Sequence, residues 1–494
     1  MKRLIVIIFI VFGAFLTFSL YRTFAYDTSV IEEVPSTTDL EYTFKIGNSS
    51  IKQITVDSGE TRYYDIVLGN PNNAKISYSV YYEMVSPSTK PDDYKIEYTS
   101  KSTGDSTGIV GNNGNITLNL LVTNTSSSSV TVKLGTVAGY VKGGDLTLNS
   151  GQVVIPKRLT AAEYVMTLND NTSGDEGSGV YKIEHSAIPA ESSATGSEIP
   201  AVTDYRYYGP SPNNYICLDM EGGSTCPDEH LYRIVGSIYE EKENTNRIKV
   251  IKATPLTDGT TKGFSWDYTS SGSYSNIWAT ITSGNYSNSL TSGSTLMKLL
   301  NSGTWWNGEN GSYYNSNSGD TTPPPATPDM IITPTLVNFT NYKLSDKAKS
   351  YITTSRYYLG AYNKNTPLTN EMYGYERGTL RYNTDRLLYW DGMVGLLYPS
   401  DYGYIAGKNC AENTVPYIYR ESTCGDKSWL LNKKFCLWTI TPIADYSNYS
   451  WTDNSYGFAY TSYATVVHPT FYLSSDVVIT FGTGSSTDPY LISK

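Results

Sequence analysis

The sequence predicts a mainly β protein with a short N-terminal apolar helix, an antiparallel β-sandwich and a larger, loop-rich α+β domain. Its 494 residues exceed what one hydrophobic core usually holds, so more than one folded unit is expected. Apolar and polar side chains alternate over much of residues 41–157, which is the period of half-buried strands. Only 17% of residues are charged and 45 are Tyr, which argues against a coiled coil or a charge-driven disordered chain.

Charge and histidine content make two classes of function improbable. The chain has 37 basic and 47 acidic residues, a net charge of −10, and no long basic run. We expect no nucleic-acid partner, because phosphate contacts need clustered Lys and Arg. The 3 histidines, His185, His230 and His468, leave little room for a multi-histidine metal site.

Residues 1–26 predict export. Lys2 and Arg3 precede an uncharged stretch over residues 4–20. At ~1.5 Å per residue this stretch spans about 25 Å, between the lengths of a signal-peptide apolar region and a membrane-spanning helix. The positive-inside rule keeps Lys2 and Arg3 in the cytoplasm and exports the remainder. Small residues ending at Ala25 offer a cleavage site, so both a cleaved signal peptide and an uncleaved anchor in the cytoplasmic membrane stay open.

The exported part begins with a tether and a sandwich. Residues 27–40 are polar and acidic, as in a short tether. Over residues 41–157, short alternating stretches such as 76–84 are separated by turn sequences such as Asn-Pro-Asn-Asn at 70–73. Several short strands with frequent turns predict an antiparallel β-sandwich of immunoglobulin-like size.

A helix and a connecting loop are expected over residues 158–199. Thr160 precedes an apolar stretch and Glu163 follows three positions later, the spacing of a capping box. From residue 200 to the C-terminus, short strand candidates alternate with long irregular stretches. The proline-rich run at 321–330 has the composition of a linker, but we interpret it as an insertion within one domain.

Five cysteines follow residue 200, and an extracytoplasmic location allows disulfides. Sequence alone leaves the pairing open. Closeness along the chain favours Cys217 with Cys226 and Cys410 with Cys424. Cys436 lies among apolar neighbours, which suits a buried thiol.

Residues 200–494 resemble a domain found at the end of many bacterial surface proteins of unknown activity. The matching stretches occur in the expected order on both sides of the proline-rich run. They are DYRYYG at 204–209, NNYIC at 213–217, CPDEHLYRIVG at 226–236, YGYERG at 373–378, WDGMVGLLYPSDYGY at 390–404, WTITP at 438–442 and VHPTFYLSSDVVITFGTGSSTDPYLI at 467–492.

The resemblance implies a fold but no chemistry. Such domains are more distantly similar to the C-type-lectin-like fold shared with formylglycine-generating enzymes, in which a closing strand follows an exposed, variable segment. The usual closing motif has Arg-Pro where this chain has His468 and Pro469. The family has no established activity, so no catalytic residue is carried over and the chain is not expected to be an enzyme.

Residues 443–464 hold the strongest indication of a binding surface. Aromatic rings there are interleaved with Ser, Asn and Thr. Tyr and Trp supply large rigid contact area, and their polar tips suit sugar faces and protein hot spots. The alternative is a set of ordinary strands with one face in the core. The candidate binding residues are Tyr446, Tyr449, Trp451, Tyr456, Tyr460 and Tyr463.

One loop has the composition of a weak calcium site. Asp170, Asp175 and Glu176 lie close together among Asn, Ser and Gly. Calcium takes six to eight oxygen ligands, which such a loop supplies in part, although EF-hand spacing is absent. A solvated acidic turn is the alternative. No other cofactor is expected.

Together these features predict a bacterial cell-surface binding or adhesion protein, membrane-anchored or secreted, that presents a Tyr-rich domain on a sandwich stalk. Its partner is expected to be an extracellular protein or a glycan. One alternative is a structural protein that assembles through open edges of the sandwich. Another is an extracellular glycan hydrolase, which needs two carboxylates about 5–10 Å apart across a cleft.

Overall fold

The computed structural model describes most of the chain beyond residue 40. The expected signal or anchor segment, the tether and the proline-rich run at 321–330 lie outside the described residues. No helix within the described part is both long and apolar enough to cross a membrane. The described residues are 41–46, 52–99, 101–141, 146–169, 174–256, 264–267, 275–279, 293–301, 313–314, 331–332, 344–363, 367–384, 386–430, 436–454, 456–463 and 465–494.

The protein is mainly β, with 41% strand, 16% helix and several antiparallel sheets, which confirms this part of the prediction. The chain divides into two compact units, Met1–Arg158 and Leu159–Lys494. Each unit has its own hydrophobic core.

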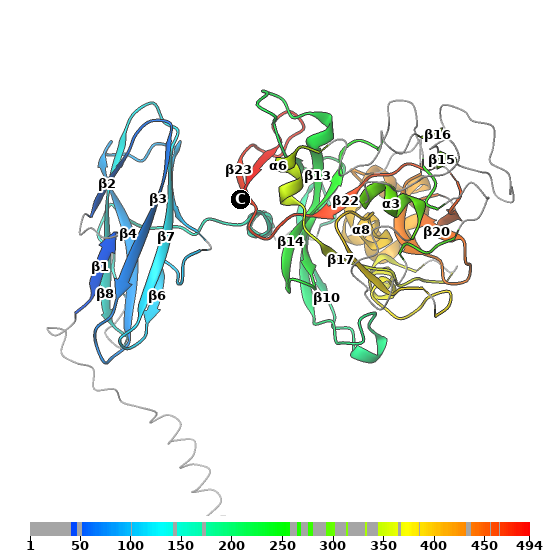
Figure 1. The fold of residues 1–494 in the computed structure, drawn as a ribbon, viewed down its shortest axis with the longest axis horizontal. Coiled ribbons are helices and arrows are strands. Elements are labelled where there is room, and N and C mark those ends of the chain that lie inside the picture. Colours follow the sequence, from blue (N-terminus) through cyan, green and yellow to red (C-terminus); the bar gives the residue numbers. More distant parts are fainter. Residues whose placement is uncertain are drawn as a thin grey trace, which may run out of the picture. The chain divides into compact units, whose positions relative to one another are not determined.

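Two antiparallel sheets pack face to face in the first unit (Figure 1). One sheet has the order β1-β3-β7-β5, and the other has the order β2-β8-β4-β6 with β9 also paired to β4. The strands are β1 (Thr43–Ile46), β2 (Gln53–Val56), β3 (Glu60–Gly69), β4 (Ile76–Ser86), β5 (Tyr94–Tyr98), β6 (Thr107–Val110), β7 (Asn115–Asn124), β8 (Val130–Tyr140) and β9 (Gln152–Val154).

Alternation along the strands explains the sandwich core. In β4, the side chains of Ile76, Tyr78, Val80 and Tyr82 lie on one face and belong to the sandwich core. Successive residues of a strand point to opposite faces, so one face of each sheet is apolar and is covered by the other sheet. Leu118 of β7 and Val132 of β8 meet in this core from the two sheets.

The second unit is built on a large sheet in the order β10-β11-β13-β12-β24-β23, with β14 paired to β13 and β22. The strands are β10 (Gly179–His185), β11 (Val202–Tyr208), β12 (Tyr215–Cys217), β13 (Leu231–Glu240), β14 (Thr245–Lys252), β22 (Thr470–Tyr472), β23 (Val478–Phe481) and β24 (Tyr490–Ser493). The expected connection over 158–199 therefore also contains β10, and the second unit begins at Leu159.

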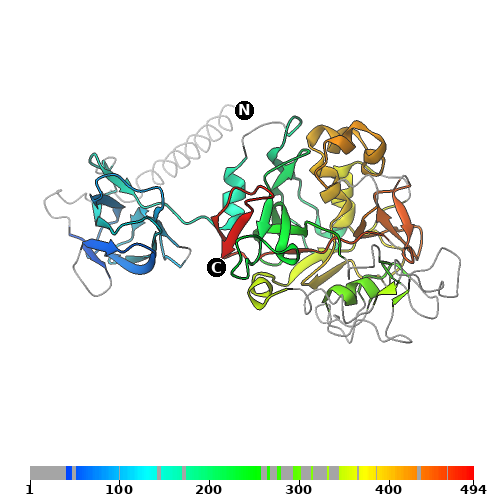
Figure 2. The ribbon, with the colours of Figure 1, turned by 90° about the horizontal axis from the view of Figure 1, so that it is seen from above.

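The end of the chain returns to the beginning of this unit. β24 pairs in parallel with β12, and β22 pairs antiparallel with β14. Figure 2 shows these C-terminal strands, in red, beside the green strands of the same sheet. The segments inserted between β14 and β22 are therefore held at both ends by one sheet.

Helices and small sheets complete the second unit. α2 (Ala161–Thr167) starts with the expected capping box between Thr160 and Glu163. α2 lies against β13 and β14, and α8 lies against β11. The other elements are η2 (Ala190–Ser192), η3 (Asp228–His230), α3 (Thr295–Asn301), β15 (Tyr313–Tyr314), β16 (Ile331–Ile332), α6 (Asp346–Tyr351), β17 (Ser355–Tyr358), α7 (Thr369–Glu376), β18 (Tyr389–Gly392), α8 (Pro399–Ile405), α9 (Lys408–Asn413), η5 (Pro416–Glu421), α10 (Thr423–Asp426), β19 (Trp438–Pro442), β20 (Tyr449–Thr452) and β21 (Phe458–Tyr460).

Aromatic rings fill much of the second core. Trp266 and Trp278 lie with ring centroids 5.3 Å apart, and Trp278 meets Trp390 at 6.1 Å. Tyr232 and Tyr357 are fully buried. Much of the unusual Tyr content is therefore core material.

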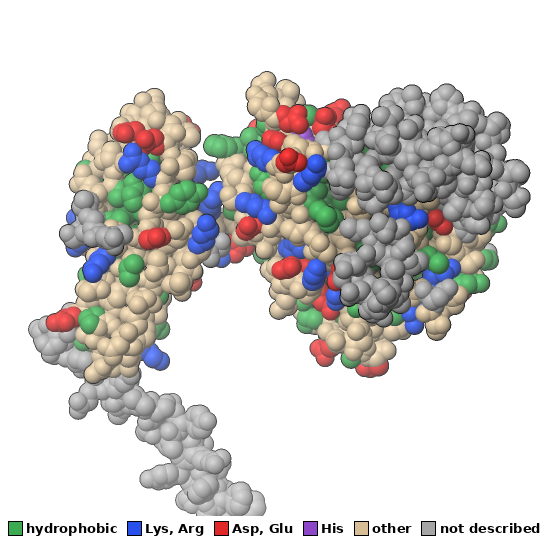
Figure 3. All heavy atoms as spheres, viewed as in Figure 1, with side chains coloured by type: hydrophobic (Ala, Val, Ile, Leu, Met, Phe, Trp, Pro, Cys, Tyr) green, Lys and Arg blue, Asp and Glu red, His purple; other side chains and the backbone are tan. Residues whose placement is uncertain are grey.

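Among the described residues drawn in Figure 3, uncharged polar side chains and backbone, in tan, make up the largest part of the surface. Basic and acidic side chains of the described residues are interspersed on this face. The low charged fraction of the sequence is thus visible at the surface.

Candidate functional site

The candidate binding residues lie on and around a three-stranded sheet formed by β19, β20 and β21 (Figure 1). β20 and β21 are antiparallel, with Tyr449 opposite Tyr460 and Trp451 opposite Phe458. Opposite residues and residues two positions apart share a face. These four rings therefore form one aromatic face of the hairpin.

One end of this face enters the core. Trp451 is fully buried, and its ring centroid lies 5.7 Å from that of Tyr402 in α8. Its predicted role as an exposed binding residue is therefore wrong, because helix α8 covers this end of the hairpin. Trp451 instead joins the hairpin to the rest of the unit.

The other end of the face is open to solvent and continues as a row of contacting rings. Centroid distances are 4.8 Å between Tyr446 and Tyr449, 4.2 Å between Tyr449 and Tyr460, and 5.5 Å between Tyr460 and Tyr463. Tyr446 is 36% exposed and the other three are partly buried. We call Tyr446, Tyr449, Tyr460 and Tyr463 the tyrosine ladder. Tyr456, in the turn between the strands, is 73% exposed.

The ladder is uncharged and has polar neighbours. Partial burial, together with a hydrogen bond that the Tyr449 hydroxyl donates to Tyr460, raises the pKa of Tyr449 above its usual value, so this hydroxyl stays neutral at physiological pH. Ser447 and Asn448 lie beside it and are partly exposed. The surface thus offers ring faces together with neutral hydrogen-bonding groups.

Asn276 fixes the turn that leads into the ladder. Its Nδ2 donates to three backbone carbonyls, those of Ile443, Tyr446 and Tyr449, at 3.1, 2.8 and 3.0 Å. Its Oδ1 accepts a hydrogen bond from Arg386 Nε at 3.1 Å. Sequence reasoning missed Asn276, because an isolated Asn in a polar stretch carries no local sign of such a role.

Asp453 anchors the far end of β20. Its Oδ1 accepts a hydrogen bond from the Leu437 backbone N–H at 2.6 Å, and its Oδ2 lies 3.4 Å from Arg420 Nε. Burial raises the pKa of Asp453 to about 6, although Arg420 opposes the shift. The hairpin is therefore attached at one end by an amide and at the other by a buried carboxyl group.

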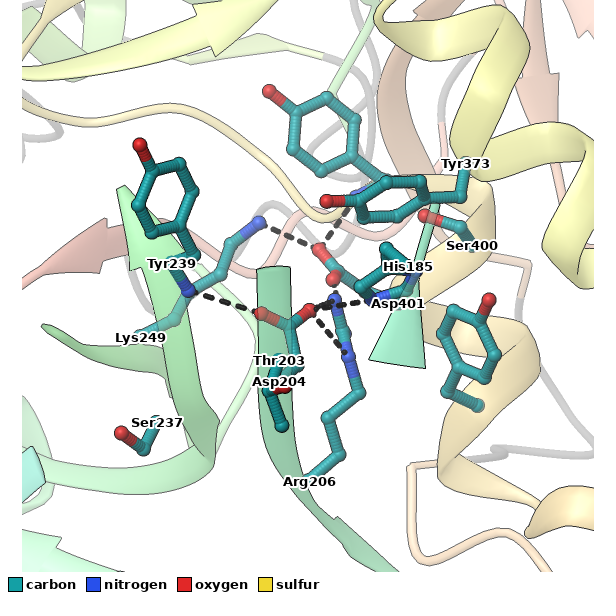
Figure 4. A network of polar contacts seen from close by, with 12 residues as sticks. His185, Thr203, Asp204, Arg206, Ser237, Tyr239, Lys249, Tyr373, Ser400 and Asp401 are labelled. Atoms are coloured by element: carbon teal, nitrogen blue, oxygen red, sulfur yellow. Dashed lines mark hydrogen bonds and ion pairs between the residues drawn. The ribbon is translucent and has the colours of Figure 1, made fainter. Parts of the chain in front are cut away.

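A second cluster of polar groups lies inside the unit and joins the large sheet to α8 (Figure 4). Asp204 Oδ2 lies 3.0 Å from His185 Nε2 and 2.8 Å from Arg206 Nη2. Asp401 lies 2.5 Å from Arg206 Nη1 and 2.5 Å from Lys249 Nζ. All five side chains are buried.

The electrostatics of this cluster favour a structural role. Burial alone would raise the pKa of Asp401, but Lys249 and Arg206 lower it to about 2. The pKa of Asp204 is likewise held low by Arg206 and His185. Burial lowers the pKa of His185, in spite of Asp204. Each carboxylate is paired with at least one cation and shielded from solvent, so the cluster connects β10, β11, β14 and α8.

The three histidines all have polar partners. In addition to His185, His230 Nε2 lies 3.0 Å from Glu221 Oε1, and His468 Nδ1 lies 2.8 Å from the Lys252 carbonyl oxygen. Burial lowers the pKa of His468 to about 4. At neutral pH a neutral His468 suits its position as a partly buried hydrogen-bonding group.

Of the weak calcium candidates, the structure describes Asp175 and Glu176. Asp170 lies outside the described residues. Asp175 Oδ1 accepts a hydrogen bond from the Asn409 N–H at 2.7 Å, and Glu176 is exposed. Both line a cavity of about 280 Å³ that also contains Lys427, whose positive charge disfavours a cation. Within the described residues, no three His, Cys, Asp or Glu side chains group as a metal site.

Both disulfides favoured by closeness along the chain are present. Cys217 is bonded to Cys226, and Cys410 is bonded to Cys424. Cys436 is a free, partly buried thiol, and burial raises its pKa. A raised thiol pKa keeps the group protonated and unreactive.

Comparison with known proteins assigns no family to this chain. No protein-family model matches it, and no curated protein matches it. The function of the chain is therefore inferred from the tyrosine ladder, the buried cluster and the disulfides.

Proposed function

We propose that the chain is an extracytoplasmic binding protein that recognises glycans through the tyrosine ladder. The observation that carries this proposal is the row of four contacting rings at the open end of the β20–β21 hairpin. Tyrosine faces stack on the apolar faces of sugar rings, and their hydroxyls bond sugar hydroxyls. Rings that already contact each other lose little entropy on binding.

The location is supported by two separate features. Disulfides form in oxidising compartments, and two are present. The N-terminal 26 residues have the pattern of a signal peptide or anchor. In this proposal residues 27–40 are a tether and the immunoglobulin-like sandwich is a spacer at the bacterial cell surface.

The fold assignment belongs to the same proposal. We infer that the second unit is a C-type-lectin-like domain of the kind its sequence resembles. Its ladder-bearing hairpin directly precedes the closing strands β22–β24, which return to β12 and β14. This order matches the expected exposed segment followed by a closing strand.

A glycan array probed with the detergent-solubilised full-length chain tests the proposal. We expect binding to a restricted set of glycans, and a loss of about tenfold or more in affinity for Tyr449→Ala and for Tyr460→Ala. Tyr375→Ala is the matched control, because this ring is 44% exposed elsewhere on the unit, on α7. Absence of glycan binding, or equal losses in all three variants, would refute the proposal.

A further inference from the structure

A groove runs along the outer edge of β10 in the large sheet. β10 pairs with β11 on one side, and on the other side its Val180 forms an isolated parallel bridge with Asn169, so the open part of this edge begins after Val180. A cavity of about 380 Å³ lies against it. We call it the edge groove; its lining includes Tyr181, Lys182, Ile183 and Glu184 of β10, Tyr404 near the end of α8, and Ala411 of α9.

The cavity contacts the edge of β10 and not one face of it. Side chains alternate between the two faces of a strand, so a pocket on one face would be lined by every second residue. Here four consecutive residues, Tyr181 to Glu184, line the same cavity. A ligand in the groove would therefore meet the backbone of β10.

The backbone groups that point into the groove can be identified. In an antiparallel ladder, alternate residues direct their N–H and C=O groups to one side. The backbone oxygen of Tyr207 accepts a hydrogen bond from Trp429 Nε1. The backbone oxygen of Tyr205 points at Gly236 of β13, so closely that a Cβ atom at position 236 would collide with it. The odd residues of β11 therefore face away from β10, and the even ones face it.

The register then assigns the free edge of β10. Even residues of β11 are opposite odd residues of β10, as Asp204 is opposite Ile183. The backbone N–H and C=O groups of Tyr181 and Ile183 therefore bond to β11, whereas those of Lys182 and Glu184 point outward, away from β11. Four residues at ~3.3 Å each give about 13 Å of open strand edge.

The walls of the groove combine an apolar floor with paired charges. Tyr181, Tyr404 and Ala411 are buried in one cluster. Lys182 and Glu184 are 2.6 Å apart and exposed on the strand side. On the helix side, Lys408 and Glu412 also line the cavity, exposed and 3.9 Å apart.

We propose that the edge groove binds an extended peptide, which adds to β10 as a further strand. Backbone bonds to Lys182 and Glu184 supply affinity, and apolar side chains at alternate positions lie on the floor. The two Lys–Glu pairs complement a segment that carries both charge signs. A single extended segment fits a groove walled by α9, whereas the edge strand of a second copy would bring a whole sheet with it.

The test uses the full-length chain in detergent and a displayed library of eight-residue peptides with alternating apolar and charged positions. Lys182→Pro removes the outward N–H and the charge, and an edge strand tolerates proline at such a position. Lys182→Ala removes the charge alone and is the matched control. Selected peptides are expected to lose about tenfold affinity for Lys182→Pro and to stay within about threefold for Lys182→Ala.

A second measurement keeps the test valid if Lys182→Pro does not fold. Binding of a selected peptide to the unaltered chain is expected to slow hydrogen exchange at the Lys182 and Glu184 amides, and N-methylation of alternate peptide residues is expected to abolish binding. Failure to select any peptide, or unchanged exchange at both amides, overturns the proposal. Self-association of the chain that Lys182→Pro removes would assign the groove to a second copy and also overturn it.

Discussion

Tyr449 and Trp451 lie two positions apart on the same face of β20, yet one ring is partly exposed and the other is fully buried. The difference comes from Tyr402, which reaches the hairpin from α8 and covers Trp451. Both residues have the same polar, aromatic sequence context. Their burial depends on a tertiary neighbour, so the sequence could not separate the partly exposed ring from the core ring.

Removal of the buried Trp451 ring and of the exposed Tyr456 ring should lower the stability by different amounts. Trp451→Ala is expected to lower the free energy of unfolding of the second unit by about 3–5 kcal/mol, because it leaves a large cavity. Tyr456→Ala is expected to change it by less than about 0.5 kcal/mol, because the ring is 73% exposed. Chemical denaturation followed by Trp fluorescence and circular dichroism measures both. Similar effects of the two substitutions would contradict the buried position of Trp451.

Glu376, a buried residue at the end of α7, should make the stability of the folded chain depend on pH. Burial raises its pKa from 4.5 to about 7, although Arg377 opposes this shift. The folded chain keeps a proton that the unfolded chain loses, so this stability is full below about pH 4.5 and is lost as pH rises through about 7. Glu376→Gln is neutral at every pH. The unfolding free energy of the natural chain, minus that of the variant, should fall by about 3 kcal/mol between about pH 4 and about pH 8. A constant difference in urea titrations would contradict the raised pKa.

At the scale of elements, the ladder depends on a segment remote in sequence. The side-chain amide of Asn276 donates hydrogen bonds to the backbone carbonyls of Ile443, Tyr446 and Tyr449, and it accepts one from Arg386. Neither Asn276 nor Arg386 belongs to the hairpin. The rings are therefore positioned by side chain–backbone bonds as well as by the strand ladder.

Asn276→Ala is expected to loosen the hairpin. Loss of the amide removes the side-chain donor to the Ile443 and Tyr446 carbonyls, which costs about 1–3 kcal/mol, whereas the Tyr449 carbonyl keeps its bond from the Ile443 N–H. Hydrogen exchange over residues 443–452 should accelerate, and glycan binding should weaken with it. Asn413→Ala is the control, because Asn413 is exposed and bonds within its own helix, to Asn409. Equal exchange in the two variants would show that Asn276 does not position the turn.

Strands in which apolar residues alternate with polar ones were predictable, and strands without this alternation were not. β4 was visible because Ile76, Tyr78 and Val80 alternate with less apolar neighbours. β10 was missed because Val180 and Tyr181 are both buried, one on each face, so the period-two signal disappears. The parallel pairing of β12 with β24 joins residues more than two hundred positions apart, which no local pattern reveals.

At the scale of the whole molecule, the two units are stabilised by different means. The first unit has nine strands in its described residues, an aliphatic-rich core and no cysteine. The second has an aromatic-rich core, a buried ion cluster and both disulfides. Cross-links reduce the chain entropy of the unfolded state, so the two disulfides stabilise the second unit and not the first.

Reduction of the disulfides should therefore lower the unfolding temperature of the second unit only. The disulfides span 9 and 14 positions, and loops of this size contribute about 2–3 kcal/mol each. Calorimetry of the full-length chain with dithiothreitol is expected to lower the unfolding temperature of the second unit and to leave that of the first unchanged. A variant with Ser at positions 217, 226, 410 and 424 should reproduce the shift without reductant. If both transitions moved together, the units would unfold as one cooperative body and the independence of their cores would be refuted, because a cross-link stabilises only the unit that unfolds with it.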